Sequence, residues 1–420
     1  MKHSLSSLLA ISLTTLTAAA ADWPGWRGPT GMGQSDDKNL PLTWGGKANA
    51  NVLWKVPLPG QDKMAAQDQN QSSPIVVGDR VFIATSYWAG KKDPKQVPEH
   101  HVACYRTTDG QKLWDTPIAP GPWLFGDLRG GYTAPTPAAD AERVYVVFGS
   151  SVIAALDHAG KLVWRKTIAP FKFDVALAAS PVLFGETVIL QCDENDRQSR
   201  LIAFDRKTGA TAWEEKRPTV GFAHSTPVLA AIGGKTQLLV SASNALQGVD
   251  PANGKVLWTC AAKGDTVSPV FGNGIAYIDT GRGGPAFAID PTGIGDVTKT
   301  HLKWKINNLP EGYGSPVAAG EYLYRLHSQE TLRCMKLATG EVMFTERLPG
   351  VSVPSSPIAS NGLLYLVSGG KSYVVKAGPK LEILSVNDLG DGGPASPAAA
   401  NGKLYIKGRK WLFCVGTATP

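Results

Sequence analysis

A Ser-Pro or Thr-Pro pair recurs eight times along this chain of 420 residues, and each pair opens the same short phrase. After a first interval of 63 residues, the steps between successive prolines are 44, 46, 42, 47, 41 and 40. A repeat of this length indicates an array of similar units, each of which packs against its neighbours. The prolines are Pro74, Pro137, Pro181, Pro227, Pro269, Pro316, Pro357 and Pro397.

Each phrase predicts four short antiparallel strands, which is the composition of one propeller blade. The second repeat, residues 136–164, reads TPAADAERVYVVFGSSVIAALDHAGKLVW. A glycine in the last turn precedes a large aromatic residue by four positions, and we expect that aromatic to pack between adjacent blades. The pairs are Gly110 and Trp114, Gly160 and Trp164, Gly209 and Trp213, Gly254 and Trp258, and Gly340 and Phe344.

The ends of the chain predict a closed ring. The last repeat, SPAAANGKLYIKGRKWLFCVG, supplies only three strands, while NVLWKV at residues 51–56 is a strand without a repeat of its own. We therefore predict an all-β fold, a single eight-bladed β-propeller at residues 51–416 whose last blade is closed by the N-terminal strand. A signal peptide at residues 1–21, an extension at residues 22–50 and a tail at residues 417–420 complete the organisation.

The repeats resemble the pyrroloquinoline-quinone-like (PQQ-like) repeat propellers. The phrases that carry the resemblance are ACYRTTDGQKLW, IAFDRKTGATAW, QGVDPANGKVLW and MKLATGEVMF, and DWPGWRGPTGMG is similar to the leader of bacterial secreted members. The resemblance covers residues 51–416 and implies the fold, whereas one propeller scaffold hosts many functions. It extends to the cofactor-free propeller lipoprotein of outer-membrane barrel assembly, although this chain lacks the lipid-bearing cysteine.

The first twenty residues predict secretion. Lys2 is followed by an apolar stretch and by small residues, so we expect cleavage near Ala20 or Ala21 and a periplasmic or extracellular protein. No later apolar run is long enough to span a bilayer. Three of the five cysteines, Cys104, Cys334 and Cys414, occupy third-strand positions where other blades carry alanine or glycine, which favours unpaired, buried thiols.

The net charge of +7 is spread over all repeats rather than clustered, which argues against nucleic acid as a partner. We expect a monomer that binds a protein or a cell-surface glycan. The long connections all belong to one face of the ring, which is where function usually lies. They are residues 86–101, 115–132, 192–200 and 280–286.

Residues just before the Ser/Thr-Pro pairs start the innermost strands and are expected at the mouth of the central channel. Arg282, in a glycine-rich loop, is placed there to pair with a carboxylate or phosphate. The predicted ligand-binding residues are Tyr132, Thr133, His224, Asp265, Arg282 and Tyr313. Capping of strands and hydrogen bonds to loop backbone are the alternative roles of these side chains.

The pattern favours a non-catalytic scaffold with no cofactor and no metal. The alternative is a PQQ-dependent alcohol or sugar dehydrogenase, for which the resemblance implies calcium, a catalytic aspartate and a tryptophan floor under the cofactor. Adjacent cysteines and C-x-x-C-H are absent from the sequence, and the acidic run at residues 193–196 is assigned to solvent rather than to calcium. Trp23, Trp26 and Trp44 are expected to pack the leader against the outside of the propeller.

Overall fold

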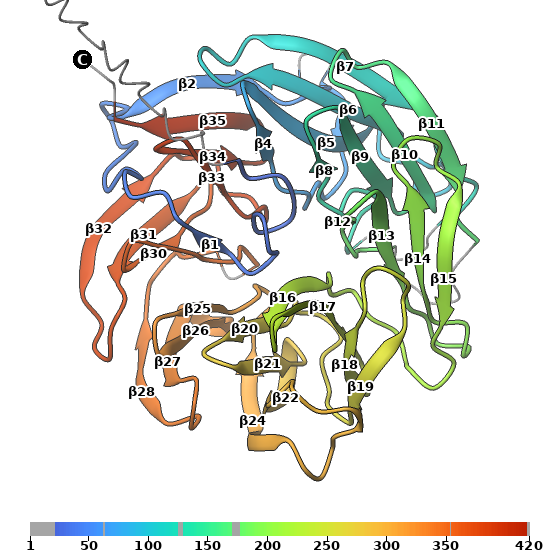
Figure 1. Cartoon of the computed structure of the whole chain (residues 1–420). Helices are drawn as coiled ribbons and strands as arrows, with labels where there is room; N and C mark the ends of the chain where they lie inside the picture. Colours follow the sequence, from blue (N-terminus) through green and yellow to red (C-terminus); the bar gives the residue numbers. More distant parts are fainter. Residues whose placement is uncertain (1–21, 62–63, 125–128, 170–176, 353, 418–420) are drawn as a thin grey trace, which may run out of the picture.

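The structure is a computed structural model of the chain and describes residues 22–61, 64–124, 129–169, 177–352 and 354–417. Eight sheets are arranged in a ring, as Figure 1 shows. The predicted all-β, eight-bladed propeller is therefore confirmed. The predicted signal peptide, at residues 1–21, lies outside the described residues.

The first four blades follow the chain from the channel outward, and each is an antiparallel meander. Blade 1 comprises β4 (Ile75–Val77), β5 (Arg80–Trp88), β6 (Glu99–Arg106) and β7 (Lys112–Ile118), with β3 (Ala66–Gln67) added beside β5. Blade 2 comprises β8 (Ala138–Ala139), β9 (Arg143–Phe148), β10 (Val152–Asp157) and β11 (Leu162–Thr167). Blade 3 comprises β12 (Val182–Phe184), β13 (Thr187–Cys192), β14 (Arg200–Asp205) and β15 (Thr211–Lys216). Blade 4 comprises β16 (Val228–Ile232), β17 (Lys235–Ala242), β18 (Ala245–Val249) and β19 (Val256–Cys260), with β23 (Gly295–Asp296) parallel to β19.

The remaining blades repeat the pattern. Blade 5 comprises β20 (Val270–Gly272), β21 (Ile275–Asp279), β22 (Arg282–Ile289) and β24 (Leu302–Glu311). Blade 6 comprises β25 (Val317–Ala319), β26 (Tyr322–His327), β27 (Thr331–Lys336) and β28 (Val342–Arg347), with the 3-10 turn η1 (Ser328–Glu330) after β26. Blade 7 comprises β29 (Ile358–Ser360), β30 (Leu363–Leu366), β31 (Lys371–Lys376) and β32 (Ile383–Asp388). Blade 8 comprises β33 (Ala398–Ala400), β34 (Lys403–Lys407) and β35 (Trp411–Gly416).

The fourth strand of blade 8 is β2 (Val52–Pro57), which pairs antiparallel with β35 and places Trp54 opposite Cys414. The predicted closure by an N-terminal strand is thus confirmed. The N-terminal strand β2 and the C-terminal strand β35 therefore lie in one sheet, and β35 has no open edge.

The aromatic residue of one blade packs on the last-turn glycine of the next blade. A Cβ on Gly209 would lie 2.6 Å from Trp164 Cδ2, and the Trp164 indole donates to the carbonyl of Arg206 at 2.9 Å. The same contact joins Trp54 to Gly110, Trp114 to Gly160, Trp213 to Gly254 and Trp304 to Gly340. The prediction that these aromatics lie between blades is confirmed.

The third-strand residue opposite the aromatic is small, as the repeat predicted. Cys104 faces Trp114, Ala155 faces Trp164 and Cys414 faces Trp54. All five cysteines are buried and unpaired. The thiols of Cys104 and Cys414 therefore act as small apolar groups that leave room for the indole rings.

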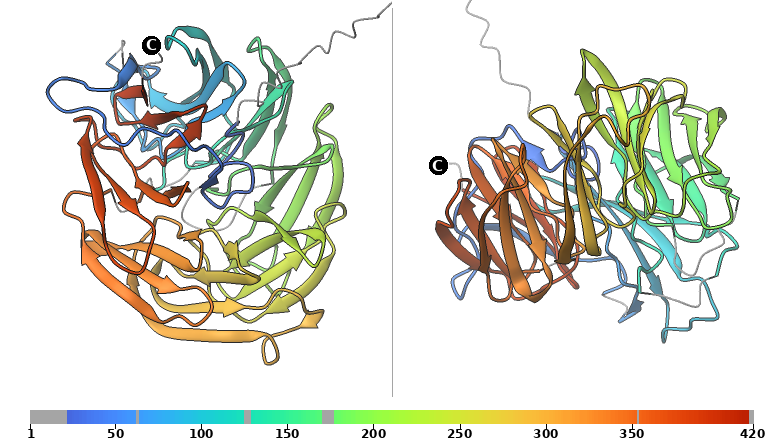
Figure 2. Two further views of the ribbon diagram at one scale, coloured as in Figure 1. Left: turned by 60° about the vertical axis from the view of Figure 1, so that its left-hand side comes forward. Right: turned by 90° about the horizontal axis from the view of Figure 1, so that it is seen from below.

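Trp44 packs beside the outer strand of blade 7, as expected: its backbone N–H donates to Asn387 Oδ1 at 2.9 Å. The rest of the leader does not pack on the outside of the ring, which corrects the expectation for Trp23 and Trp26. It crosses the face of the short turns, pairing Trp23 with Val76 of β4 and adding β1 (Gln34–Ser35) in parallel to β29 of blade 7. The leader, in blue, runs over the ring in Figure 2, left. Trp23 and Trp44 are buried among the strands of blades 1, 7 and 8. The extension at residues 22–50 is therefore a structural part of the propeller.

Candidate functional site in the central channel

The central channel holds a cavity of about 1160 Å³. Its walls come from the long-loop face. Asn195 belongs to the loop between β13 and β14, Arg282 is the first residue of β22, and Arg129 belongs to the connection between blades 1 and 2. Three of the four long connections identified in the sequence thus reach the cavity. The opposite face carries the leader, so the cavity opens on the side of the long loops.

Among the described residues, four cationic side chains and one carboxylate line this cavity. Arg129, Arg282, Lys371 and Arg409 contribute the positive charges, and Asp68 is the carboxylate. Burial raises the pKa of Asp68, and its Oδ2 accepts the backbone N–H of Tyr132 at 2.5 Å. The remaining wall is mainly serine, threonine, asparagine, glutamine and glycine. The electrostatics of the site favour an anion.

A closed ring of hydrogen bonds, the hydroxyl belt, encircles the channel. In every blade the residue before the repeat proline donates its backbone N–H to the hydroxyl of the equivalent residue in the next blade, at 2.9 to 3.1 Å. The last of these bonds runs from Ser396 to Ser73 and closes the belt. The members are Ser73, Thr136, Ser180, Thr226, Ser268, Ser315, Ser356 and Ser396.

The belt explains the repeated Ser/Thr-Pro pair. A residue before proline is held in an extended conformation, which keeps its hydroxyl in the same orientation at the start of every inner strand. The proline itself has no N–H to donate. Five of the eight hydroxyls, from Ser180, Thr226, Ser268, Ser315 and Ser356, line the cavity.

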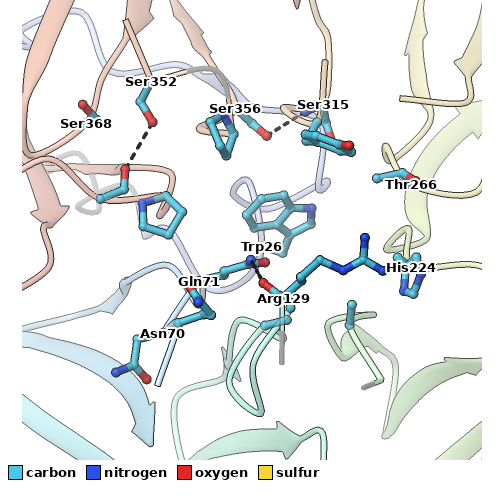
Figure 3. Close-up of a pocket in the computed structure, with 18 of the residues that line it drawn as sticks. Trp26, Asn70, Gln71, Arg129, His224, Thr266, Ser315, Ser352, Ser356 and Ser368 are labelled. Atoms are coloured by element: carbon cyan, nitrogen blue, oxygen red, sulfur yellow. Dashed lines mark hydrogen bonds between the residues drawn. The ribbon is translucent and has the colours of Figure 1, made fainter. Parts of the chain in front are cut away.

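The leader supplies the floor. Trp26 lines the cavity, and its indole N–H donates to the hydroxyl of Ser268 at 3.2 Å; Figure 3 shows the ring near the middle of the pocket. Arg27 is 3% exposed, and its NH2 donates to the carbonyls of Met32 at 3.0 Å and Pro316 at 2.5 Å. Burial lowers the pKa of Arg27 to about 9, so the group stays cationic at neutral pH. Sequence reasoning missed both residues, because the leader has no counterpart in the repeats.

His224, Arg282 and Tyr313, all predicted from the sequence, do line the cavity. The Arg282 Nε lies 3.2 Å from Asp265 Oδ2 and donates to the Thr266 hydroxyl at 2.9 Å. Its guanidinium lies 5.5 Å from the centre of the Phe222 ring. Asp265 therefore holds Arg282 in place from behind rather than lining the cavity itself.

His224 is neutral at physiological pH. Burial lowers the pKa of His224 to about 4, and the charge of Arg282 contributes to the shift. Its backbone N–H donates to the carbonyl of Asp265 at 2.6 Å. Arg282 and His224 thus form one cluster at the wall of the cavity, in which the arginine carries the charge.

Tyr132 and Thr133 are placed differently from the prediction. Both are 0% exposed. Tyr132 packs on Trp88 in a small cluster that includes Trp123, and the Thr133 hydroxyl lies 2.5 Å from that of Ser86. Tyr132 turns inward because Trp88, Val97 and Trp123 pack around it beside blade 1. Tyr132 and Thr133 are therefore buried structural residues and do not line the cavity.

The cavity residues do not match a calcium-dependent quinone site. Among the described residues, no group of three histidine, cysteine, aspartate or glutamate side chains is placed to hold a metal ion. The acidic run is only partly in solvent, which corrects the expectation: Asp193 is buried and forms an ion pair with Arg217 at 2.5 Å. Trp26 offers an aromatic floor, whereas Trp88 and Trp123 lie in the cluster with Tyr132. Asp68 is the one carboxylate among the described residues that line the cavity, whereas calcium takes several oxygen ligands.

The fold and the channel define a class: an eight-bladed propeller of quinoprotein-like repeats with an open, polar cavity on one face. The family model described as outer membrane protein assembly factor BamB matches residues 98–345, more than half of the chain, and the chain belongs to this family. The resemblance to PQQ-like repeat propellers is thereby confirmed.

Solved structures and a curated relative agree on the architecture. BamB from Moraxella catarrhalis is 14% identical, with a TM-score of 0.61 over 88% of this chain and 98% of its own. A europium-containing methanol dehydrogenase is 12% identical, with a TM-score of 0.54 over 92% of this chain and 89% of its own. These likenesses show the fold alone. The tetrathionate hydrolase of Acidithiobacillus ferrooxidans is 26% identical over 356 residues, 77% of this chain, and the chain spans 62% of that relative's length.

None of the described residues forms a helix long and apolar enough to cross a membrane.

Proposed function

We propose that the protein is a non-catalytic binding scaffold of the cell envelope, secreted to the periplasm, which takes a protein partner on its long-loop face. The observation that carries this proposal is the difference between the two faces. The long loops and the open cavity share one face, while the leader covers the other. A surface glycan is the alternative partner.

The family supports a role in assembly rather than in redox chemistry. The matched family is described as an outer membrane protein assembly factor. Asp68 is the one carboxylate among the described cavity residues, so we do not extend the proposal to a PQQ-dependent dehydrogenase. The hydrolase activity of the curated relative is not carried over either, because the chain spans 62% of that protein.

Site-specific photo-crosslinking in cells tests which face binds the partner. A photoreactive amino acid replaces Lys91 or Arg197 on the long-loop face, and Lys38 or Asn361 on the closed face; all four positions are exposed. We expect one protein adduct, shared by the two long-loop positions and absent from the closed-face positions. Adducts confined to Lys38 and Asn361 would contradict the proposal. An adduct whose added mass is saccharide rather than protein would identify the glycan partner.

A further inference from the structure

The hydroxyl belt has donors that the protein does not use. A serine or threonine hydroxyl offers one O–H donor besides its acceptor lone pairs. Every belt hydroxyl accepts a backbone N–H, and Ser268 accepts the Trp26 indole as well. Among the described residues, no acceptor is found for any of the eight hydroxyl protons. A buried donor without an acceptor is costly, so a ligand or water has to accept these bonds.

Positive charge lines the same cavity as these hydroxyls. Arg282 and Lys371 line the cavity wall, and Arg409 lines it on blade 8. Arg27 lies on the leader side of the belt, bonded to the carbonyl of Pro316, the residue after Ser315. Among the described residues, its Nε and Nη1 have no hydrogen-bond partner and no carboxylate pairs with it. An unpaired, buried guanidinium raises the potential in the channel above it, because the surrounding dielectric is low.

We propose that the channel binds a small multivalent oxyanion, such as a sulfate-like or dicarboxylate ion, on the cavity-lining part of the belt. The ion accepts hydrogen bonds from the hydroxyls of Ser268, Ser315 and Ser356 and from the neighbouring Thr226, under the field of Arg27 and Arg282. An oxyanion offers hydrogen-bond acceptors and no donors. It can therefore accept from several unused O–H groups at once. The site does not depend on the proposed protein partner.

Isothermal titration of the mature protein with sodium sulfate and with sodium succinate, at constant ionic strength in sodium chloride, tests this site. We expect saturable one-to-one binding of at least one dianion, and competition when both bind. Arg282→Ala should weaken binding more than tenfold, because it removes a charge from the wall and leaves Asp265 unpaired.

The belt provides a matched pair of variants. Thr226 and Thr136 each accept one backbone N–H from the preceding blade, but only Thr226 lines the cavity. Thr226→Val should weaken binding of the dianion about tenfold, which is the loss expected for one hydrogen bond to a charged group. Thr226→Ser keeps the hydroxyl and should bind the dianion like the wild type. Thr136→Val should leave dianion binding unchanged, although it should lower the melting temperature about as much as Thr226→Val does.

Three results would overturn the proposal. The first is no binding heat with either dianion. The second is an equal weakening of dianion binding by Thr226→Val and Thr136→Val. The third is dianion binding that Arg282→Ala weakens but Thr226→Val does not. The first two would mean that water accepts from a purely structural belt. Crystals of the wild-type protein soaked in selenate give a check that needs no variant: an anomalous peak should lie within hydrogen-bond distance of the Ser315 and Ser356 hydroxyls. A peak on the outer surface only would contradict the site.

Discussion

At the scale of single residues, the propeller depends on contacts that each blade makes with the next. The last-turn glycines have positive φ and no room for a side chain, because the indole of the preceding blade covers them. The belt hydroxyls make the corresponding contact at the channel. One residue at each end of a blade therefore sets its spacing from the neighbouring blade.

The glycine contact predicts a difference between two substitutions with similar backbone strain. Gly209 has φ +70° and lies under Trp164, whereas Gly274 has φ +75° and open space around its Cα. Gly274→Ala should cost about 1 kcal/mol for the left-handed backbone. Gly209→Ala should cost a further ~1–3 kcal/mol, because the methyl group collides with the indole. Urea unfolding measures both, and equal losses would refute the blade-to-blade contact.

Buried neutral histidines predict how stability depends on pH. The two ring nitrogens of His100 lie 2.9 Å from the Ser86 hydroxyl and 2.8 Å from the Ser150 hydroxyl, and burial lowers the pKa of His100 to about 3. The unfolded chain takes up a proton near pH 6.5, but the folded chain does not until near pH 3. Stability from this group is therefore complete above pH 6.5 and is lost as the pH falls.

The test replaces His100 with glutamine, which keeps a donor and an acceptor for the two hydroxyls. The wild-type free energy of unfolding should fall between pH 7 and pH 4.5, and about 2–3 kcal/mol of that fall should disappear in His100→Gln. Chemical unfolding at the two pH values measures the difference. An identical fall in both proteins would show that His100 is protonated in the folded state.

At the scale of elements, two pieces of the N-terminal segment have distinct structural roles. Strand β2 completes the sheet of blade 8, and the leader covers the short-turn face and supplies Trp26 to the cavity. The leader also buries Trp23 and Trp44 in the core of blades 1, 7 and 8. A ring without the leader would keep its eight sheets but lose apolar packing and its floor.

Two truncations separate these roles. Removing residues 22–46 should lower the melting temperature because Trp23 and Trp44 are lost, while the ring still unfolds in one transition. Removing residues 22–57 should lower it much further, since β35 then has an open edge. Calorimetry of the two proteins distinguishes them; if the longer truncation melted no lower than the shorter one, closure by β2 would be wrong.

The sequence predicted what the repeats encode. The strand pattern, the position of Trp164 between blades and the fourth strand around Trp54 all follow from local spacing. The belt was not predicted, although its Ser-Pro and Thr-Pro pairs were seen, because each hydroxyl bonds to a different blade. Trp26 lies in the leader, outside the repeats, so no spacing could indicate that it reaches the channel.

At the scale of the whole molecule, the ring surrounds a cavity, and the leader crosses the face opposite the long loops. The leader, the belt and the loops converge on a single polar cavity with a positive lining. A partner that approaches the open face meets the long loops first and the cavity afterwards. The protein-binding role and the oxyanion site can therefore coexist on one face.

Complementation of a deletion strain tests the central proposal, that a protein partner binds the open face. The description of the family, an outer membrane protein assembly factor, suggests the readout. Two matched charge reversals are compared: Lys91→Glu with Lys92→Glu on the long-loop face, and Lys38→Glu with Lys47→Glu on the leader. All four lysines are exposed. The measured quantity is the amount of β-barrel proteins in the outer membrane.

We expect the deletion to reduce these proteins, the leader variant to restore them and the long-loop variant to fail at equal protein levels. Unchanged outer membrane proteins in the deletion strain, or full restoration by the long-loop variant alone, would contradict the account.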